Sequence, residues 1–167
     1  MIKLGVSLLD GVMWVKPKLW NNNFNRLSIC DLLFDTGATM TAIDTSVAKR
    51  AGISLKNAKV VKVGGIGGRK EAHIVTIKEF WLGDVNLGAV SVHVIDFDED
   101  CSASGAGVLG MNIIRNFITT IDLTQSVDNS EGVIQMKPLF EPSDITTLEN
   151  FNPLQSRFGL WKLAQTD

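Results

Sequence analysis

The stretch Leu32-Leu33-Phe34-Asp35-Thr36-Gly37-Ala38 decides how this chain is interpreted. Three apolar residues, a pattern typical of a buried strand, lead to one carboxylate that is followed at once by a Thr-Gly turn. The tripeptide Asp35-Thr36-Gly37 occurs once in the 167 residues. A single copy indicates either half of a two-carboxylate site, completed by a second identical chain, or an ordinary turn.

Each residue of this turn has a physical use. The Thr36 hydroxyl can hydrogen-bond to a symmetry mate or to neighbouring backbone, and Gly37 permits close backbone contact where a Cβ would clash. Two Asp35 carboxylates within about 3 Å of each other would share one proton. One could then act as a base on water while the other polarises a carbonyl. The competing interpretation is a β-turn made from common turn residues.

A glycine-rich run lies further along the chain, at Val63-Gly64-Gly65-Ile66-Gly67-Gly68. Alternating residues flank it on both sides, which predicts the tip of a β-hairpin with one apolar side chain at its end. A phosphate-binding loop is disfavoured because no Gly-Lys-Ser/Thr follows and no helix is expected there. The alternative is a flexible surface hairpin without a role.

A third element is Gly107-Val108-Leu109-Gly110, which leads into a short helix expected at Met111 to Phe117. The apolar pair can pass behind the Asp35 loop and support it, because Gly110 allows close backbone contact. The alternative is a plain loop that enters a core helix.

Short strands dominate the remaining pattern, which predicts a mostly β, barrel-like single domain with two short helices. Leu27 to Phe34 is nearly continuous in apolar residues, as in a strand buried on both faces. The first helix is expected at Ser46 to Ala51, capped by Asp44 or Thr45 and ended by Gly52. The other expected strands are 2–9, 12–20, 41–44, 59–63, 73–81, 85–97, 118–123 and 133–136.

Composition excludes several classes of function. A net charge of -2 with dispersed Lys and Arg gives no reason to expect a nucleic-acid partner. No apolar run approaches the roughly 20 residues that span a bilayer, and residues 1–10 do not read as a secretory signal, so we expect a cytoplasmic protein without a membrane partner. Cys30 is expected as a buried thiol and Cys101 lies in a polar loop. No spacing of Cys, His and acids predicts a metal site or a cofactor.

Taken in order, these elements resemble the retropepsins, the single-domain aspartic proteases of retroviruses and retroelements, and their bacterial relatives. The resemblance rests on the Asp-Thr-Gly-Ala loop, the Gly-Gly-Ile-Gly-Gly hairpin and the Val-Leu-Gly support. It covers about residues 27–123 and extends to the first strands. It implies a closed-barrel homodimer with one active site on the two-fold axis.

The resemblance also implies a role for each site residue. Asp35 from each chain would form the catalytic dyad, Thr36 would hydrogen-bond between the chains, and Gly37 would offer its carbonyl to the substrate. The hairpin would act as a flap over an extended peptide bound in β-fashion. The residues expected to bind the substrate are Ala38, Gly64, Gly65, Ile66, Gly67 and Gly68, and those expected to support the loop are Val108, Leu109 and Gly110.

The chain departs from the retroviral pattern at two places. The stretches Ala38-Thr39-Met40 and Gly110-Met111-Asn112 lack the Asp and the Arg that form an ion pair near the dimer contact of retroviral enzymes. The chain is also longer, so we expect a protease domain at 1–137 and a C-terminal extension at 138–167 that packs on the barrel, replaces the terminal interface sheet or occludes the cleft.

Two functions from different classes remain. The first is a homodimeric aspartic endopeptidase with acid-shifted cleavage beside apolar residues. The second is a catalytically inactive retropepsin-like module for dimerisation or peptide binding, motivated by the missing ion pair and the long tail. A third possibility, that the segment was cut from a larger protein, is weakly disfavoured by Met1.

Overall fold

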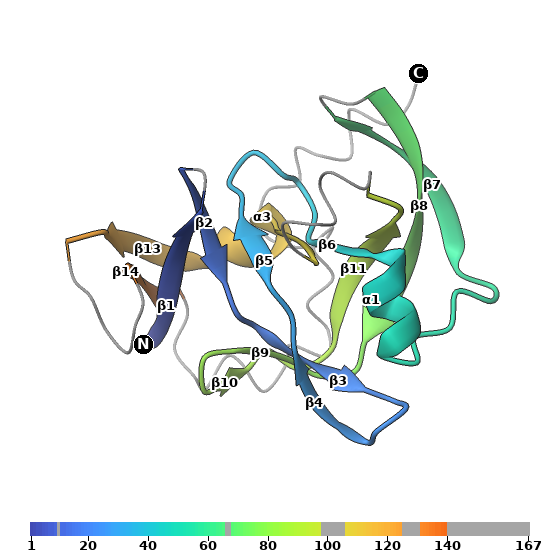
Figure 1. The fold of residues 1–167 in the computed structure, drawn as a ribbon, viewed down its shortest axis with the longest axis horizontal. Helices are drawn as coiled ribbons and strands as arrows, with labels where there is room; N and C mark the ends of the chain where they lie inside the picture. The colour runs from blue at the N-terminus through green and yellow to red at the C-terminus, as the bar shows by residue number, and fades with distance from the viewer. Residues whose placement is uncertain (10, 66–67, 98–105, 125–130, 140–167) are drawn as a thin grey trace.

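Strands make up most of the part of the chain that the computed structural model describes, namely residues 1–9, 11–65, 68–97, 106–124 and 131–139 (Figure 1). The elements of the first half are β1 (Ile2–Leu9), β2 (Val12–Val15), β3 (Lys18–Asn21), β4 (Arg26–Ile29), β5 (Leu32–Phe34), β6 (Ala42–Asp44), α1 (Thr45–Arg50) and β7 (Lys59–Gly65). Those of the second half are β8 (Gly68–Ile77), β9 (Phe80–Leu82), β10 (Val85–Asn86), β11 (Val90–Ile95), β12 (Gly107–Leu109), α3 (Met111–Ile114), β13 (Phe117–Asp122) and β14 (Gly132–Pro138). The mostly β fold with two short helices is therefore confirmed.

The strands form two sheets. The larger has ten strands in the order β13-β14-β1-β2-β5-β12-β6-β11-β8-β7, and the smaller has four in the order β10-β9-β3-β4. Both are open within the described residues, since β13 and β7 stand at the two ends of the larger sheet. A closed barrel is thus not observed in the single chain and stays a prediction.

Two expected long strands are each broken into a pair. The run 12–20 divides into β2 and β3 at Lys16-Pro17, and the run 27–34 divides into β4 and β5 at Cys30-Asp31. Pro17 has no N–H for a ladder, but its carbonyl accepts from the Cys30 N–H at 3.1 Å. The segments β2–β3 and β4–β5 therefore pass from one sheet to the other side by side. The expectation of burial on both faces is wrong for β4, where Ile29 is 65% exposed.

Other boundaries shift for local reasons. The expected helix 111–117 ends at Ile114 because Phe117 already belongs to β13. The run 73–81 divides into β8 and β9, and the run 85–97 divides into β10 and β11 around Gly88, whose φ is 73°. The cap of α1 is confirmed, since the Asp44 side chain accepts from the Ser46 N–H and Gly52 has a φ of 65°.

The core gathers between the two sheets and the helices. Its largest fully buried side chains come from strands of both sheets, and α1 and α3 add apolar side chains of their own. They include Leu19, Leu32, Ile43, Phe80, Leu109 and Ile134. Because β5, β6 and β12 are neighbours in the larger sheet, the core fixes the position from which the Asp35 loop leaves. Residues 140–167, with most of the expected C-terminal extension, lie outside the described residues, so the boundary at 137 stays a prediction.

Candidate active site

Asp35 leaves the sheet at the end of a fixed strand pair. β5 and β12 pair in parallel, with Phe34 beside Leu109, and both side chains are buried. The Asp35 N–H extends this pairing by donating to the Leu109 carbonyl at 3.1 Å. The backbone of the acid is therefore held by the core directly beneath it.

The Asp-Thr-Gly turn is closed by its own carboxylate. Oδ1 of Asp35 accepts from the Gly37 N–H at 2.7 Å, a local bond that Asp side chains often make in turns. No hydrogen bond to Oδ2 is found within the described part of the chain. Asp35 is half-buried, while Thr36 and Gly37 are exposed. The turn thus presents one carboxylate oxygen, a hydroxyl and a bare backbone at the surface.

Gly110 lies where the chain passes closest behind this loop. A Cβ on Gly110 would stand 2.5 Å from the Met40 carbonyl carbon and 2.6 Å from its oxygen, which real Cβ atoms do not tolerate. Gly107, with a φ of 149°, is likewise pressed against the Ala42 backbone. Gly110 therefore lies against the Met40 backbone, which follows Asp35, while Val108 and Leu109 pair with Leu33 and Phe34, which precede it.

The start of helix α3 is hydrogen-bonded to the Asp35 loop. The Met111 N–H donates to the Ala38 carbonyl at 2.8 Å, and the Asn112 N–H donates to the Thr39 carbonyl at 3.0 Å. The first N–H groups of a helix have no partners within it, so the loop supplies partners that α3 otherwise lacks. These bonds join the two stretches in which retroviral enzymes carry the ion pair that is missing here.

A side-chain pair, buried Thr41 with half-buried Asn112, completes the support, and the sequence pattern did not predict it. Oδ1 of Asn112 accepts from both the N–H and the hydroxyl of Thr41, at 2.7 and 2.8 Å. The same hydroxyl accepts from the Gly110 N–H at 3.0 Å, and the Asn112 amide donates to the Ser91 carbonyl at 3.1 Å. Thr41 is fully buried. The two residues are 71 positions apart, so no local pattern signals the pair.

The glycine-rich hairpin is formed by β7 and β8. Their pairing runs from Lys59 opposite Ile74 to Gly65 opposite Gly68, and Ile66 and Gly67 lie outside the described residues. Gly68 has a φ of 101°, and a Cβ on Gly64 would meet nothing within 4 Å. The hairpin therefore exists where expected. No contact between it and the Asp35 loop is described.

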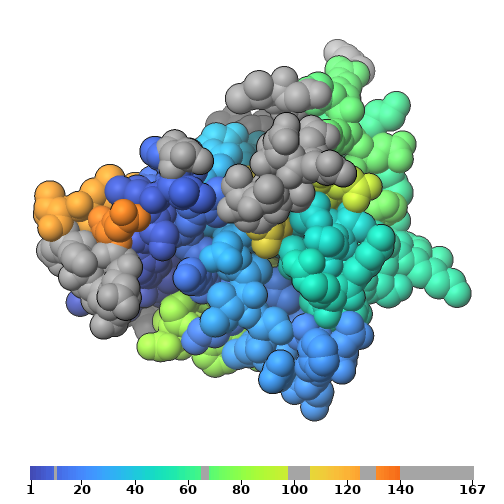
Figure 2. All heavy atoms as spheres, viewed as in Figure 1, coloured from blue at the N-terminus to red at the C-terminus, as the bar shows by residue number. Residues whose placement is uncertain are grey.

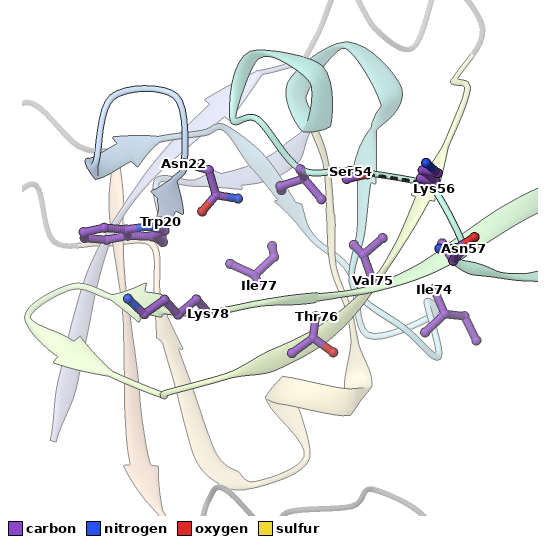
Figure 3. Close-up of a pocket in the computed structure, with 12 residues that line it drawn as sticks. Trp20, Asn22, Ser54, Lys56, Asn57, Ile74, Val75, Thr76, Ile77 and Lys78 are labelled. Atoms are coloured by element: carbon purple, nitrogen blue, oxygen red, sulfur yellow. Dashed lines mark hydrogen bonds between the residues drawn. The ribbon is translucent and has the colours of Figure 1, made fainter.

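Two pockets of the single chain lie away from Asp35. One, of about 250 Å³, lies between the segment 53–58 and β8, with Lys78 stacked over the Trp20 ring at 4.9 Å (Figure 3). The other, of about 540 Å³, lies between α1 and the β3–β4 hairpin, where Phe24 and Ile29 are exposed. Neither is lined by residues 35–41. Neither of these two cavities can therefore serve as a substrate cleft at Asp35.

The buried titratable groups do not provide a rival centre. Burial, with Asp31 nearby, raises the pKa of the Cys30 thiol to about 12, so it is not a thiolate nucleophile at neutral pH. Burial also lowers the pKa of His93. Cys30 is buried and free, as expected, while Cys101 lies outside the described residues.

Asp44, at the end of β6, is buried and stays ionised. Burial alone would raise its pKa, but hydrogen bonds from Ser46 and the Phe97 N–H, and the charge of Arg50, lower the pKa below its ordinary value of 3.8. Among the described residues no three His, Cys or acidic side chains gather to hold a metal ion, and no helix has the length and apolarity to cross a membrane.

Comparison with known proteins agrees with this arrangement. A family profile described as "Aspartyl protease" matches residues 23–113, more than half of the chain. The chain belongs to the aspartyl protease family. Its retropepsin-like fold is shared with a retropepsin-like aspartic protease from Rickettsia conorii, with a TM-score of 0.56 and 20% identity over 80% of this chain and 97% of that one.

A second solved structure is more distant. The retroviral protease-like domain of Ddi1 from Leishmania major matches with a TM-score of 0.49 and 17% identity, over 76% of this chain and 94% of that one. No curated protein matches. The family match and the fold shared with the Rickettsia conorii protein confirm the resemblance to retropepsin-like aspartic proteases that the motifs predicted.

The aspartyl protease match spans the Asp35 loop, the hairpin and the start of α3. It stops at residue 113, so β13 and β14 lie beyond it. The matched part of the chain, which carries the motifs, thus ends before β13 and β14, which lie at one end of the larger sheet.

Proposed function

We propose that this aspartyl protease is an endopeptidase that acts as a homodimer, with Asp35 of each chain forming the catalytic dyad. The observation that supports it most is the state of the Asp35 turn. Its backbone is fixed from below by β12 and α3, whereas Thr36 and Gly37 are exposed. A rigid turn with an exposed tip is what a second identical turn needs in order to approach across a two-fold axis.

The chemistry follows from bringing two carboxylates together. They share one proton, because two charges at about 3 Å in a partly buried site repel strongly. The ionised carboxylate takes a proton from a water molecule, and the oxygen of that water attacks the peptide carbonyl. The protonated carboxyl donates its hydrogen to the carbonyl oxygen, which gives a neutral tetrahedral diol. Proton transfer to the amide nitrogen then releases the amine and the acid.

The remaining predicted residues bind the peptide. Thr36 hydrogen-bonds across the dimer, and the Gly37 carbonyl and Ala38 contact an extended substrate. The hairpin from Gly64 to Gly68 covers the substrate and excludes water. The second chain closes the open sheets into the expected barrel.

The test is cleavage of a diverse peptide library by the wild type and by Asp35→Asn. We expect the wild type to cut beside apolar residues, to be inhibited by a statine-type hydroxyl isostere, and to lose at least about 1,000-fold in kcat when the dyad is neutralised. Asp31→Asn is the matched control, because Asp31 is an exposed acid four positions earlier. Undiminished cleavage by Asp35→Asn rejects the mechanism. A dimer that cleaves no peptide supports the inactive binding module instead.

A further inference from the structure

A row of side chains crosses the middle of the larger sheet, on the face opposite to the core. The pairings of β2, β5, β12, β6 and β11 place these residues side by side, in the order Trp14, Leu33, Val108, Ala42 and His93. Figures 1 and 2 show the two ends of this sheet, β13–β14 in orange and β7–β8 in green, at opposite ends of the molecule. The row lies between these ends.

The Asp35 side chain lies on the same face as this row. Neighbouring residues of a strand point to opposite faces of the sheet. Leu32 and Phe34 are buried in the core, so Leu33 points to the other face. The Asp35 N–H continues the strand pairing by its bond to the Leu109 carbonyl, so its side chain follows the same alternation and lies on the side of Leu33.

His93 is the titratable member of the row. Val92 and Val94, its neighbours in β11, are fully buried in the core, so the His93 ring lies on the side of Asp35. Its direct neighbours on β6 and β8 are Ala42 and Ile74, which are both apolar. The ring is half-buried, and no hydrogen bond to it is found among the described residues. Its nitrogens are therefore open to a partner from outside the chain.

The state and position of the ring define what it can bind. Burial lowers the pKa of His93 from its ordinary value of 6.5, so at neutral pH the uncharged ring has one N–H donor and one acceptor nitrogen. Leu33 and His93 are three strand spacings apart, or about 14 Å. An extended peptide rises about 3.4 Å per residue, so this distance corresponds to about four residues.

We propose that His93 is a specificity-determining residue that hydrogen-bonds a carboxylate or carboxamide oxygen of one substrate side chain, within about four residues of the scissile bond. Between Asp35 and His93 the row consists of Leu33, Val108 and Ala42, which offer such an oxygen no partner. A substrate with Asp, Glu, Asn or Gln at that one position is thereby selected. The proposal rests on the proposed function for the place of the scissile bond at Asp35.

Matched peptides test this preference. The peptides have Leu at the positions beside the cut and carry Glu, Gln or Leu in turn at each position within about four residues of it. We expect the wild type to favour Glu or Gln over Leu about 10-fold in kcat/KM at one position, as one added hydrogen bond allows. The ratio of Glu to Gln peptides distinguishes a carboxylate from a carboxamide.

Two substitutions of His93 separate hydrogen bonding from shape. His93→Leu removes both ring nitrogens and should abolish the 10-fold preference at that position. His93→Gln keeps a donor and an acceptor and should restore part of the preference. A merely structural role of His93 would lower cleavage of all the peptides alike and would leave their ratio unchanged. A wild-type ratio in His93→Leu overturns the proposal.

The other histidine of the chain, His73, is the matched control. It pairs with Val94 in the β8–β11 ladder and therefore lies on the core side of the sheet. His73→Gln should leave the ratio between the peptides as in the wild type. A loss of the preference in His73→Gln as large as in His93→Leu overturns the assignment to His93.

A binding measurement separates this contact from the chemistry. In Asp35→Asn, the ring C–H resonances of His93 and His73 can be followed by NMR while each peptide is added. We expect the Glu or Gln peptide to shift the His93 resonance more than the Leu peptide does, and to leave that of His73 in place. This response in a protein that cleaves no peptide keeps the His93 contact and rejects the endopeptidase. Asp35-dependent cleavage without this response and without the preference keeps the endopeptidase and rejects the His93 contact.

Discussion

The Asp35 loop and the β7–β8 hairpin both depend on glycine, but for opposite reasons. Behind the loop, Gly110 leaves no room, because any Cβ would overlap the Met40 backbone. On the hairpin, Gly64 has nothing within 4 Å of a Cβ. The loop is bound by β12, α3 and Asn112, whereas the hairpin is held by its own pairing and by β11. The loop therefore needs glycine for close contact, whereas the hairpin needs it for backbone conformation at Gly68, whose φ is 101°, and not at Gly64.

The largest predicted loss of stability comes from a methyl group added at Gly110, and the same change at Gly64 is its control. Gly110→Ala forces the Met40 backbone away and should cost about 3 kcal/mol of the free energy of unfolding, measured by urea denaturation. Gly64→Ala should change the same quantity by less than about 0.5 kcal/mol, since the residue is exposed and unobstructed. Equal costs at the two positions would show that the close contact behind the loop is not maintained.

A smaller effect should follow from removing one buried hydroxyl. Thr41→Val keeps the shape of the side chain but leaves the Gly110 N–H without its acceptor and weakens the Asn112 contact. We expect a loss of about 2 kcal/mol in the free energy of unfolding, because an unsatisfied buried group costs about 1–3 kcal/mol.

The control for this hydroxyl is Thr76→Val on the hairpin strand β8. Thr76 is exposed, and its hydroxyl lies 3.5 Å from that of Ser91. Its loss should stay within about 0.5 kcal/mol by the same denaturation measurement. A Thr76→Val cost as large as that of Thr41→Val would remove the distinction between the two regions.

The sequence predicted the features that are local. The Asp-Thr-Gly turn, the cap at Asp44 and the hairpin around Gly64 each depend on residues close together in the chain, and each lies where it was expected. The bend at Pro17 and Cys30 was missed because apolar periodicity continues through it while the backbone changes sheets. Alternation alone does not report which sheet a strand joins.

The support of the site was predictable only in outline. Gly110 could be expected to allow close contact, but its partner, Met40, follows from the parallel pairing of β5 and β12. The Thr41–Asn112 pair depends on residues 71 positions apart. Its members are an ordinary strand Thr and an ordinary helix Asn, and only the tertiary fold brings them together.

The smallest predicted effect concerns the acid dependence of stability. Asp44 ends β6, the strand that follows the Asp35 loop, and its carboxylate caps α1 and accepts from the Phe97 N–H. Its pKa is lowered below 3.8 in the folded chain, so its contribution is complete above the unfolded value and is lost as the pH falls through the folded value. Asp44→Ala should therefore cost about 1 kcal/mol at pH 7, as for other helix caps.

The difference between Asp44→Ala and the wild type should shrink only below pH 3.8, in urea unfolding measured from pH 7 down to the acid limb. Glu71→Ala, on the exposed face of the hairpin strand, is the control and should change stability by less than about 0.5 kcal/mol. A difference that already closes above pH 5 would mean that the hydrogen bonds at Asp44 do not hold its carboxylate ionised. In that case the start of α1 would be no more firmly held than the exposed face of the hairpin.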